Sequence, residues 1–153
     1  MKILMVCLGN ICRSPLADGL LAQKIRNENL NHNVDSAGTC DHHIGQSPDA
    51  RMTKTAENFG LSLAHLRARE FTAADFDEFD RVYAMDKSNY QNIISLSRNQ
   101  SDINKVRMIL DENHPNQDME VPDPYYGGKE GFLNVYSMLD EATDCIMNEL
   151  RIK

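Results

Sequence analysis

The stretch Val6-Cys7-Leu8-Gly9-Asn10-Ile11-Cys12-Arg13-Ser14-Pro15 follows directly on an apolar run that begins at Ile3. An apolar run, a glycine-containing loop and a Ser-Pro pair are typical of a strand, a tight loop and a helix start, with Ser14 as the N-cap and Pro15 as the first helical residue. Such a junction places several backbone N–H groups around one point, at the positive end of a helix dipole. The stretch therefore predicts an anion-binding loop, with Cys7 at the end of the strand as its nucleophile.

The composition of the chain limits its class and its partners. Its 153 residues suffice for one domain with a core of its own, which we expect to span residues 1–153. The formal net charge of −7 argues against a nucleic-acid partner, because phosphate backbones require clustered lysines and arginines. No apolar run approaches the length of a membrane span, so no membrane partner is expected.

The cysteines are few and irregularly spaced, at Cys7, Cys12, Cys40 and Cys145. They lack the pattern of a secreted disulfide framework, and no Cys-x-x-Cys or Cys/His set has the spacing of a structural zinc site. The apolar segment at the N-terminus is shorter than the core of a signal peptide. We therefore expect a reduced, cytoplasmic protein without a structural metal.

Short apolar runs alternate with helical patterns along the chain. The patterns predict strands over residues 2–7, 34–39, 81–85 and 106–110, and helices over 14–27, 49–59, 86–96 and 130–152, with a short helix or turn at 75–80. Ser47-Pro48 repeats the cap-and-proline signal, and either Asp86 or Ser88 can cap the helix that follows the third strand. Residues 41–48, 99–104 and 111–128 are predicted as loops. Alternating strands and helices favour an α/β fold, with a parallel sheet between two layers of helices.

Single residues of the loop allow more than one interpretation. Cys7 could be a buried structural thiol, as cysteines often are, but its place under a helix N-terminus and beside an arginine favours a reactive thiolate. Arg13 can fold its planar guanidinium over a bound oxyanion and hold two of its oxygens. The Ser14 hydroxyl can cap the helix or donate to the Cys7 sulfur. From these residues alone, the loop suits transfer, reduction or carriage of an oxyanion.

The stretch 6–15 resembles the signature loop of the low-molecular-weight protein tyrosine phosphatases. A second motif of that family, Asp-Pro followed by aromatic residues, is present as Asp123-Pro124-Tyr125-Tyr126, and Ser36-Ala37-Gly38 also matches, so the resemblance covers essentially the whole chain. It implies a three-layer sandwich with flavodoxin-like topology, in which the four parallel strands lie in the order 2-1-3-4. It also implies hydrolysis of phosphotyrosine and small aryl phosphates through a phosphocysteine intermediate, without a metal or another cofactor.

The resemblance implies a role for several residues. Cys7 would be the nucleophile, Arg13 the phosphate clamp, and Asp123 the general acid that protonates the leaving phenolate and later activates water, a contribution of typically ~10²–10⁴ in rate. Contacts with the substrate are implied for Leu8, Gly9, Asn10, Ile11, Cys12, Ser14, His42, Tyr125 and Tyr126. Asn10, Ser36 and His65 match residues that brace the loop by hydrogen bonds. Cys12 matches a cysteine that pairs with the nucleophile under oxidation, which would protect Cys7.

Some positions depart from the family pattern or bear on its alternatives. His42 and His43 stand where relatives usually place a large aromatic residue at the pocket rim, and Asp18 stands where many carry glutamate. Arginine phosphatases share the loop, but they typically have threonine at the position of Ile11. Arsenate reductases need further cysteines, which residues 75–90 lack, and a cysteine phosphocarrier would not need Asp123. The expected partners are a phosphotyrosine protein and, in the loop, phosphate or other oxyanions, with the chain itself a monomer or a weak dimer.

Overall fold

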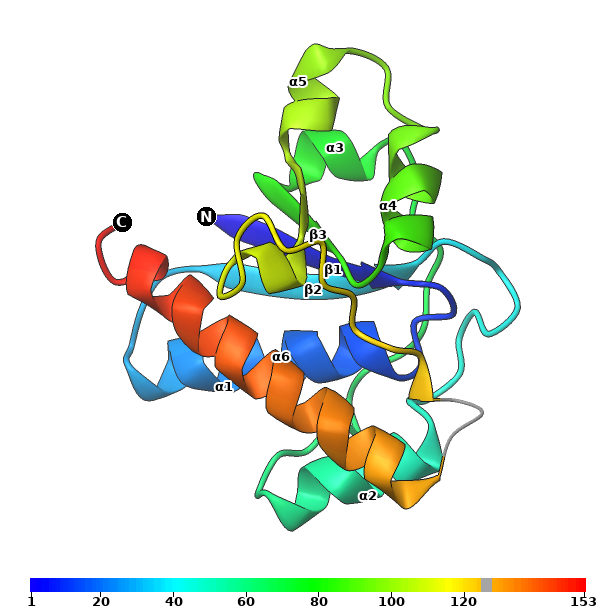
Figure 1. The fold of residues 1–153 in the computed structure, drawn as a ribbon, viewed down its shortest axis with the longest axis vertical. Helices are drawn as coiled ribbons and strands as arrows, with labels where there is room; N and C mark the ends of the chain where they lie inside the picture. The colour runs from blue at the N-terminus through cyan, green and yellow to red at the C-terminus, as the bar shows by residue number, and fades with distance from the viewer. Residues whose placement is uncertain (125–127) are drawn as a thin grey trace.

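The structure, a computed structural model, describes residues 1–124 and 128–153. A four-stranded parallel sheet forms its centre (Figure 1). The strands are β1 (Lys2–Cys7), β2 (Asn33–Gly38), β3 (Arg81–Ala84) and β4 (Val106–Met108), and they lie in the order β2-β1-β3-β4. The order implied by the resemblance is therefore confirmed. The register sets Cys7 opposite Gly38, where both strands reach their carboxyl ends.

Helices cover both faces of the sheet, as Figure 1 shows. One face carries α1 (Arg13–Asn27), α2 (Ala50–Asn58) and α6 (Lys129–Leu150), and the other carries α3 (Asp75–Glu78), α4 (Lys87–Ile94) and α5 (Gln100–Asn104). Because successive side chains of a strand point to opposite faces, Ile3 and Met5 join the core under α1 and α6, while Leu4 and Val6 join the core under α4. A continuous apolar strand is thus buried on both sides, as parallel sheets require.

Both helix starts predicted from a Ser-Pro pair are wrong, whereas one of the two caps predicted for a third helix is confirmed. The helix α1 begins at Arg13 with Cys12 as its N-cap, so Ser14 lies in the first turn. The N-cap of α2 is Asp49, whose carboxylate accepts from the N–H groups of Arg51 and Met52, and Ser47-Pro48 precedes the helix. The choice between two caps for α4 falls on Asp86, which accepts from the Asn89 N–H at 2.7 Å.

Two segments near the fourth strand also differ from the prediction. Residues 99–104, expected to be a loop, contain α5, whose first turn is capped by the Asn99 side chain. The strand β4 ends at Met108, and the chain continues into the 3₁₀ helix η1 (Ile109–Asp111). In the part of the chain that the structure describes, no helix is both long and apolar enough to cross a bilayer.

Candidate active site

The loop between β1 and α1 surrounds a cavity of about 180 Å³ at the carboxyl edge of the sheet. Its walls are formed by Cys7, Leu8, Gly9, Ile11, Cys12, Arg13, Cys40, His42, His43 and Asp123. The cavity therefore brings together the three residues expected to be catalytic, from positions up to 116 apart in the sequence (123 minus 7). Tyr125 and Tyr126, expected at the same cavity, lie outside the described residues.

A chain of hydrogen bonds leads to the sulfur of Cys7. The Asn10 amide donates to Ser14 Oγ at 2.8 Å, and Ser14 Oγ lies 3.0 Å from Cys7 Sγ. Since Ser14 Oγ accepts from Asn10, its single proton can be donated to the sulfur; its other acceptor, the Ala37 carbonyl, is farther away at 3.4 Å. Negative charge on Cys7 would therefore meet a hydroxyl donor, whether the sulfur attacks or departs.

The loop is also fixed through its backbone. Asn10 has a left-handed conformation with φ of 57°, and its side-chain carbonyl accepts from the Arg69 N–H at 3.0 Å. The Thr39 N–H donates to the Cys7 carbonyl at 2.9 Å, and the Cys40 N–H donates to the Leu8 carbonyl at 3.0 Å. Residue 38 must be glycine, because a Cβ there would lie 2.8 Å from the Leu8 carbonyl oxygen.

The expected bracing residues occupy different places. Asn10 is buried and holds Ser14, as described above. Ser36 is buried in β2 and hydrogen-bonds to Asp18 on α1, so it supports the helix that follows the loop rather than the loop itself. His65 is exposed in a turn, and within the described chain no hydrogen bond joins it to the loop. The segment that follows His65 reaches the loop through the Arg69 backbone N–H, which donates to the Asn10 side chain.

Arg13 is almost completely buried, with 2% of its surface exposed. Its Nη1 donates to Asp86 Oδ2 at 2.7 Å and to the Val121 carbonyl at 2.8 Å, while Nη2 lies 3.7 Å from Asp123 Oδ2. Burial acts to lower the pKa of the guanidinium, but the negative groups at Cys7, Asp86 and Asp123 outweigh it, and the pKa is raised above its ordinary value. Arg13 is therefore a fixed positive charge in the wall of the cavity.

Asp86 is the residue of the site that sequence reasoning missed. One of its carboxylate oxygens caps α4 and the other holds Arg13, so a single side chain fixes both a helix and the guanidinium. The pattern alone assigned it only the capping role. A usable signal was its position directly after the third buried strand, because the carboxyl ends of parallel strands meet at one edge of the sheet.

The surroundings of Cys12 disfavour its thiolate form. Burial raises the pKa of the Cys12 thiol far above its ordinary range, and the negative charges of Asp49 and Cys7 raise it further. Cys12 is therefore a neutral thiol at physiological pH and a poor nucleophile, since the thiolate is the reactive form. This leaves Cys7, next to the Ser14 donor, as the candidate nucleophile of the loop.

Histidines form part of the rim of the cavity. The His43 ring packs so closely on the loop that a Cβ on Gly9 would lie 2.9 Å from its Cδ2 atom. His43 Nδ1 lies 3.0 Å from Gln46 Oε1, and the Ala68 N–H donates to the Gln46 carbonyl, so the rim is tied to the segment that also holds Asn10. The expectation that His42 lines the site agrees with its place in the cavity wall.

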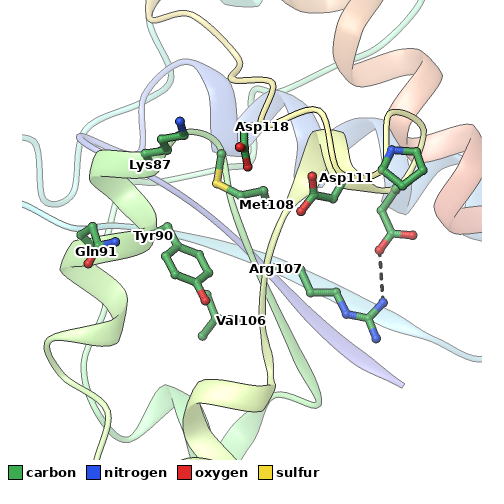
Figure 2. A pocket seen from close by; sticks show the side chains of 10 residues that line it. Lys87, Tyr90, Gln91, Val106, Arg107, Met108, Asp111 and Asp118 are labelled. Atoms are coloured by element: carbon green, nitrogen blue, oxygen red, sulfur yellow. Dashed lines mark hydrogen bonds and ion pairs between the residues drawn. The ribbon is translucent and has the colours of Figure 1, made fainter.

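A larger hollow, of about 570 Å³, lies elsewhere, between α4, β4 and η1 (Figure 2). Figure 2 shows Lys87 and Tyr90 on one side and Arg107 on the other, and Arg107 pairs with Glu112 at 3.3 Å. No candidate catalytic residue lines this hollow, so the smaller cavity with converging reactive groups is the better candidate. Among the described residues, no group of three or more His, Cys, Asp or Glu side chains is placed to hold a metal ion.

Comparisons with known proteins agree with this geometry. A family model described as low molecular weight phosphotyrosine protein phosphatase matches residues 2–153. The protein of that name from Dictyostelium discoideum is 38% identical over 167 residues, which cover 98% of this chain and 92% of the relative. The structure of a protein tyrosine phosphatase from Entamoeba histolytica matches with a TM-score of 0.91 and 38% identity, over 99% of this chain and 97% of that one. A Drosophila arginine phosphatase matches with a TM-score of 0.87 and 32% identity, over 97% of each chain.

Proposed function

The chain belongs to the low molecular weight phosphotyrosine protein phosphatase family, and we propose that its cavity at Cys7 hydrolyses protein phosphotyrosine and small aryl phosphates through a phosphocysteine intermediate. One observation carries this proposal: a thiol with a hydroxyl donor, a buried guanidinium and an aspartate from a distant loop line one cavity of about 180 Å³. Each of the three groups supplies a different part of phosphoryl transfer.

In the first step, Cys7 Sγ attacks the phosphorus atom and the bond to the phenolic oxygen breaks. The loop N–H groups and Arg13 hold the phosphate oxygens, and the hydrogen bond to Asp86 keeps the guanidinium in place for this task. Asp123 donates a proton to the leaving oxygen, whose conjugate acid has a pKa near ~10. The distance of 3.7 Å between the Arg13 and Asp123 side chains supports a common position for the two groups around one phosphate.

In the second step, water attacks the phosphorus atom of phosphocysteine and the sulfur–phosphorus bond breaks. Asp123, now ionised, takes a proton from the attacking water, and Cys7 departs as a thiolate that accepts a hydrogen bond from Ser14. Inorganic phosphate then leaves the loop. Because Asp123 must be protonated in the first step while Cys7 is ionised, the free enzyme should have a bell-shaped pH dependence of kcat/KM.

Phosphoarginine is the second candidate substrate, because the matching structures include an arginine phosphatase. Ile11 supports the aryl ester: it is an apolar side chain in the wall of the cavity, suited to contact with an aromatic ring. The test compares initial rates on a phosphotyrosine peptide, an aryl phosphate and phosphoarginine, for the wild type and Cys7→Ser, without added metal. We expect the wild type to prefer the aryl esters and Cys7→Ser to be inactive. Faster turnover of phosphoarginine, or aryl phosphatase activity in Cys7→Ser, would contradict the proposal.

The proposal extends to the whole chain and its surroundings. We take residues 1–153 as one catalytic domain, acting as a monomer or a weak dimer in the cytoplasm, where thiols remain reduced. Cys7 and Cys12 line the same cavity, which supports a reversible disulfide between them under mild oxidation. Peptide mapping after limited peroxide treatment tests this pairing, and its absence would remove the protective role of Cys12.

A further inference from the structure

A third cavity, of about 440 Å³, lies between α2 and the first turn of α6, which are neighbours in Figure 1. Arg51 and Lys54 of α2 and Lys129 of α6 supply its charged groups, and Phe132 supplies an aromatic wall. Among the described residues, no carboxylate lines it. In a chain with a net charge of −7, this is a locally basic site.

The three cations differ in how they are held. The Arg51 guanidinium lies over the Phe132 ring, 4.7 Å from its centroid, and pairs with Asp49 at 3.0 Å. Arg51 is therefore fixed in position with part of its charge balanced. Lys54 and Lys129 are exposed, and neither makes an ion pair with any residue in the described ranges. Their charges remain available for an anion that enters from outside.

The start of α6 adds to the positive potential of the cavity. This helix has 22 residues, and its N-cap, Gly128, offers no side chain to accept from the free N–H groups of the first turn. Within the described structure, no atom lies within 4 Å of the position that a Cβ on Gly128 would take. Glu130 in the first turn offsets part of the dipole, which leaves the lysines as the main attraction.

Residues next to the basic cavity contact residues next to the catalytic one. The Asp49 N–H donates to the Ile11 carbonyl of the loop at 2.7 Å, which joins the start of α2 to the site. A Cβ on Gly131 would lie 3.8 Å from Pro124 Cβ, which places the first turn of α6 beside the residue that follows Asp123. Arg51 is also near enough for its charge to act on the Cys12 thiol. A segment of substrate that leaves the catalytic cavity on this side would meet the lysines.

We propose that the basic cavity binds an acidic side chain of the phosphoprotein substrate, close in sequence to the phosphotyrosine held at Cys7. This inference rests on the proposed function and adds a preference for acidic flanking residues. The group that the cavity recognises is a carboxylate. Because the net charge of the protein is −7, the rest of its surface repels an acidic peptide, and the attraction is confined to Arg51, Lys54 and Lys129. The other source of a carboxylate would be a free anion that binds independently of phosphotyrosine.

The test uses two phosphotyrosine peptides that differ only in flanking glutamates or glutamines. We expect the wild type to favour the acidic peptide by about threefold to tenfold in kcat/KM, the range that one or two exposed ion pairs give. The double variant Lys54→Gln/Lys129→Gln should reduce this ratio to about one, as should ~1 M salt, at which the screening length is ~3 Å. The matched control Lys87→Gln/Lys153→Gln removes the same charge elsewhere and should keep the preference.

Three outcomes of this peptide comparison would overturn the inference. They are equal rates for the two peptides, a preference that survives in the double variant, and a preference lost equally in the control variant. A further arm adds an acidic peptide without phosphotyrosine: inhibition of both substrates that requires Lys54 and Lys129 would show independent binding of a free anion and contradict the flanking role. Rates on the neutral peptide and on an aryl phosphate test the proposed phosphatase activity separately. The preference for acidic flanking residues can therefore fail while the proposed function holds.

Discussion

Ser14 is completely buried, and its hydroxyl oxygen accepts a hydrogen bond from the Asn10 amide. Its one hydroxyl proton is therefore available for donation to the Cys7 sulfur. A hydrogen bond to a charged group contributes ~1.5–3 kcal/mol, or roughly a factor of 10–100 in rate. We expect Ser14→Ala to lower kcat by this factor and to slow the breakdown of phosphocysteine most, because the thiolate then departs without a donor. Rapid-quench kinetics measure that step, with Ser36→Ala as the control that removes a buried hydroxyl away from the sulfur. Unchanged breakdown would contradict the role of Ser14.

Asp123 should matter in proportion to the basicity of the leaving group. For Asp123→Asn, we expect a loss of ~10²–10⁴ in kcat/KM, which reports on the first step, for phenyl esters and a much smaller loss for esters of strongly acidic phenols, which depart without a proton. A series of aryl phosphates whose phenols differ in acidity measures how the loss of rate depends on the leaving group. Inhibition by inorganic phosphate checks that the loop still binds its anion. An equal loss across the series would remove the general-acid assignment.

The sequence predicted those residues of the site that lie in short motifs of neighbouring residues. Cys7, Arg13 and Asp123 each lie in a short motif, and all three line one cavity. The partnership of Asp86 with Arg13 spans 73 residues and depends on how strands align, which no local pattern contains. His65 was assigned a place in the site by resemblance, yet the contact to Asn10 is made by a backbone N–H, which any residue except proline at position 69 could supply.

At the scale of elements, α4 and the site share Asp86. We expect Asp86→Asn to keep the cap, since asparagine is an equally good N-cap, but to lose the charge opposite the buried Arg13. The expected result is a fall in kcat/KM of about tenfold or more, by analogy with other buried charge pairs. Asn99→Ala, which removes only the cap of α5, should cost about 1 kcal/mol of stability and leave kcat/KM unchanged. An unchanged kcat/KM in Asp86→Asn would show that Asp86 acts only as a cap.

The helix α1 contains a carboxyl group whose protonation affects stability. Burial raises the pKa of Asp18 from 3.8 to about 7, with a further contribution from the negative charge of Asp35. The folded protein thus keeps this proton to about pH 7, whereas the unfolded chain releases it near 3.8, so Asp18 makes the free energy of unfolding decrease as the pH rises from about 4 to about 7.

Asp18→Asn should remove this pH dependence, because the amide resembles the protonated acid and can still accept from Ser36. We expect the variant to exceed the wild type in stability at pH 8, by on the order of a few kcal/mol at most, and to be close to it at about pH 4. Urea denaturation at the two pH values measures the difference. A parallel pH dependence in both proteins would show that Asp18 is ionised in the folded state.

The elements were predictable where their periodicity is long and poorly predictable where tertiary contacts decide. All four strands and the long helices lie close to their expected positions. The short helix α5 has only five residues and depends on the cap from Asn99, so its polar sequence is typical of a loop. Ser47 and Asp49 are both good caps, and the hydrogen bond from the Asp49 N–H to Ile11 belongs to the folded loop rather than to the local sequence.

In the whole molecule, the parallel sheet is what assembles the site. Strands β1, β2 and β3 end at the same edge and deliver Cys7, Gly38 and Asp86 there, the usual place for ligands in an open parallel sheet. The chain after η1 returns across this edge, where the Val121 N–H donates to the Met85 carbonyl and the Val121 carbonyl accepts from Arg13. Asp123 is therefore positioned by the fold as a whole.

The central claim is that Cys7 carries the phosphoryl group during turnover. The most direct measurement mixes the enzyme with an excess of aryl phosphate, quenches it within the first turnover and locates any phosphoryl group by peptide mass spectrometry. A phosphoryl group on the peptide with Cys7, absent from Cys7→Ser and longer-lived in Ser14→Ala, is the result we predict. Turnover with no phosphoryl group on Cys7, or with one on another residue, would contradict the account.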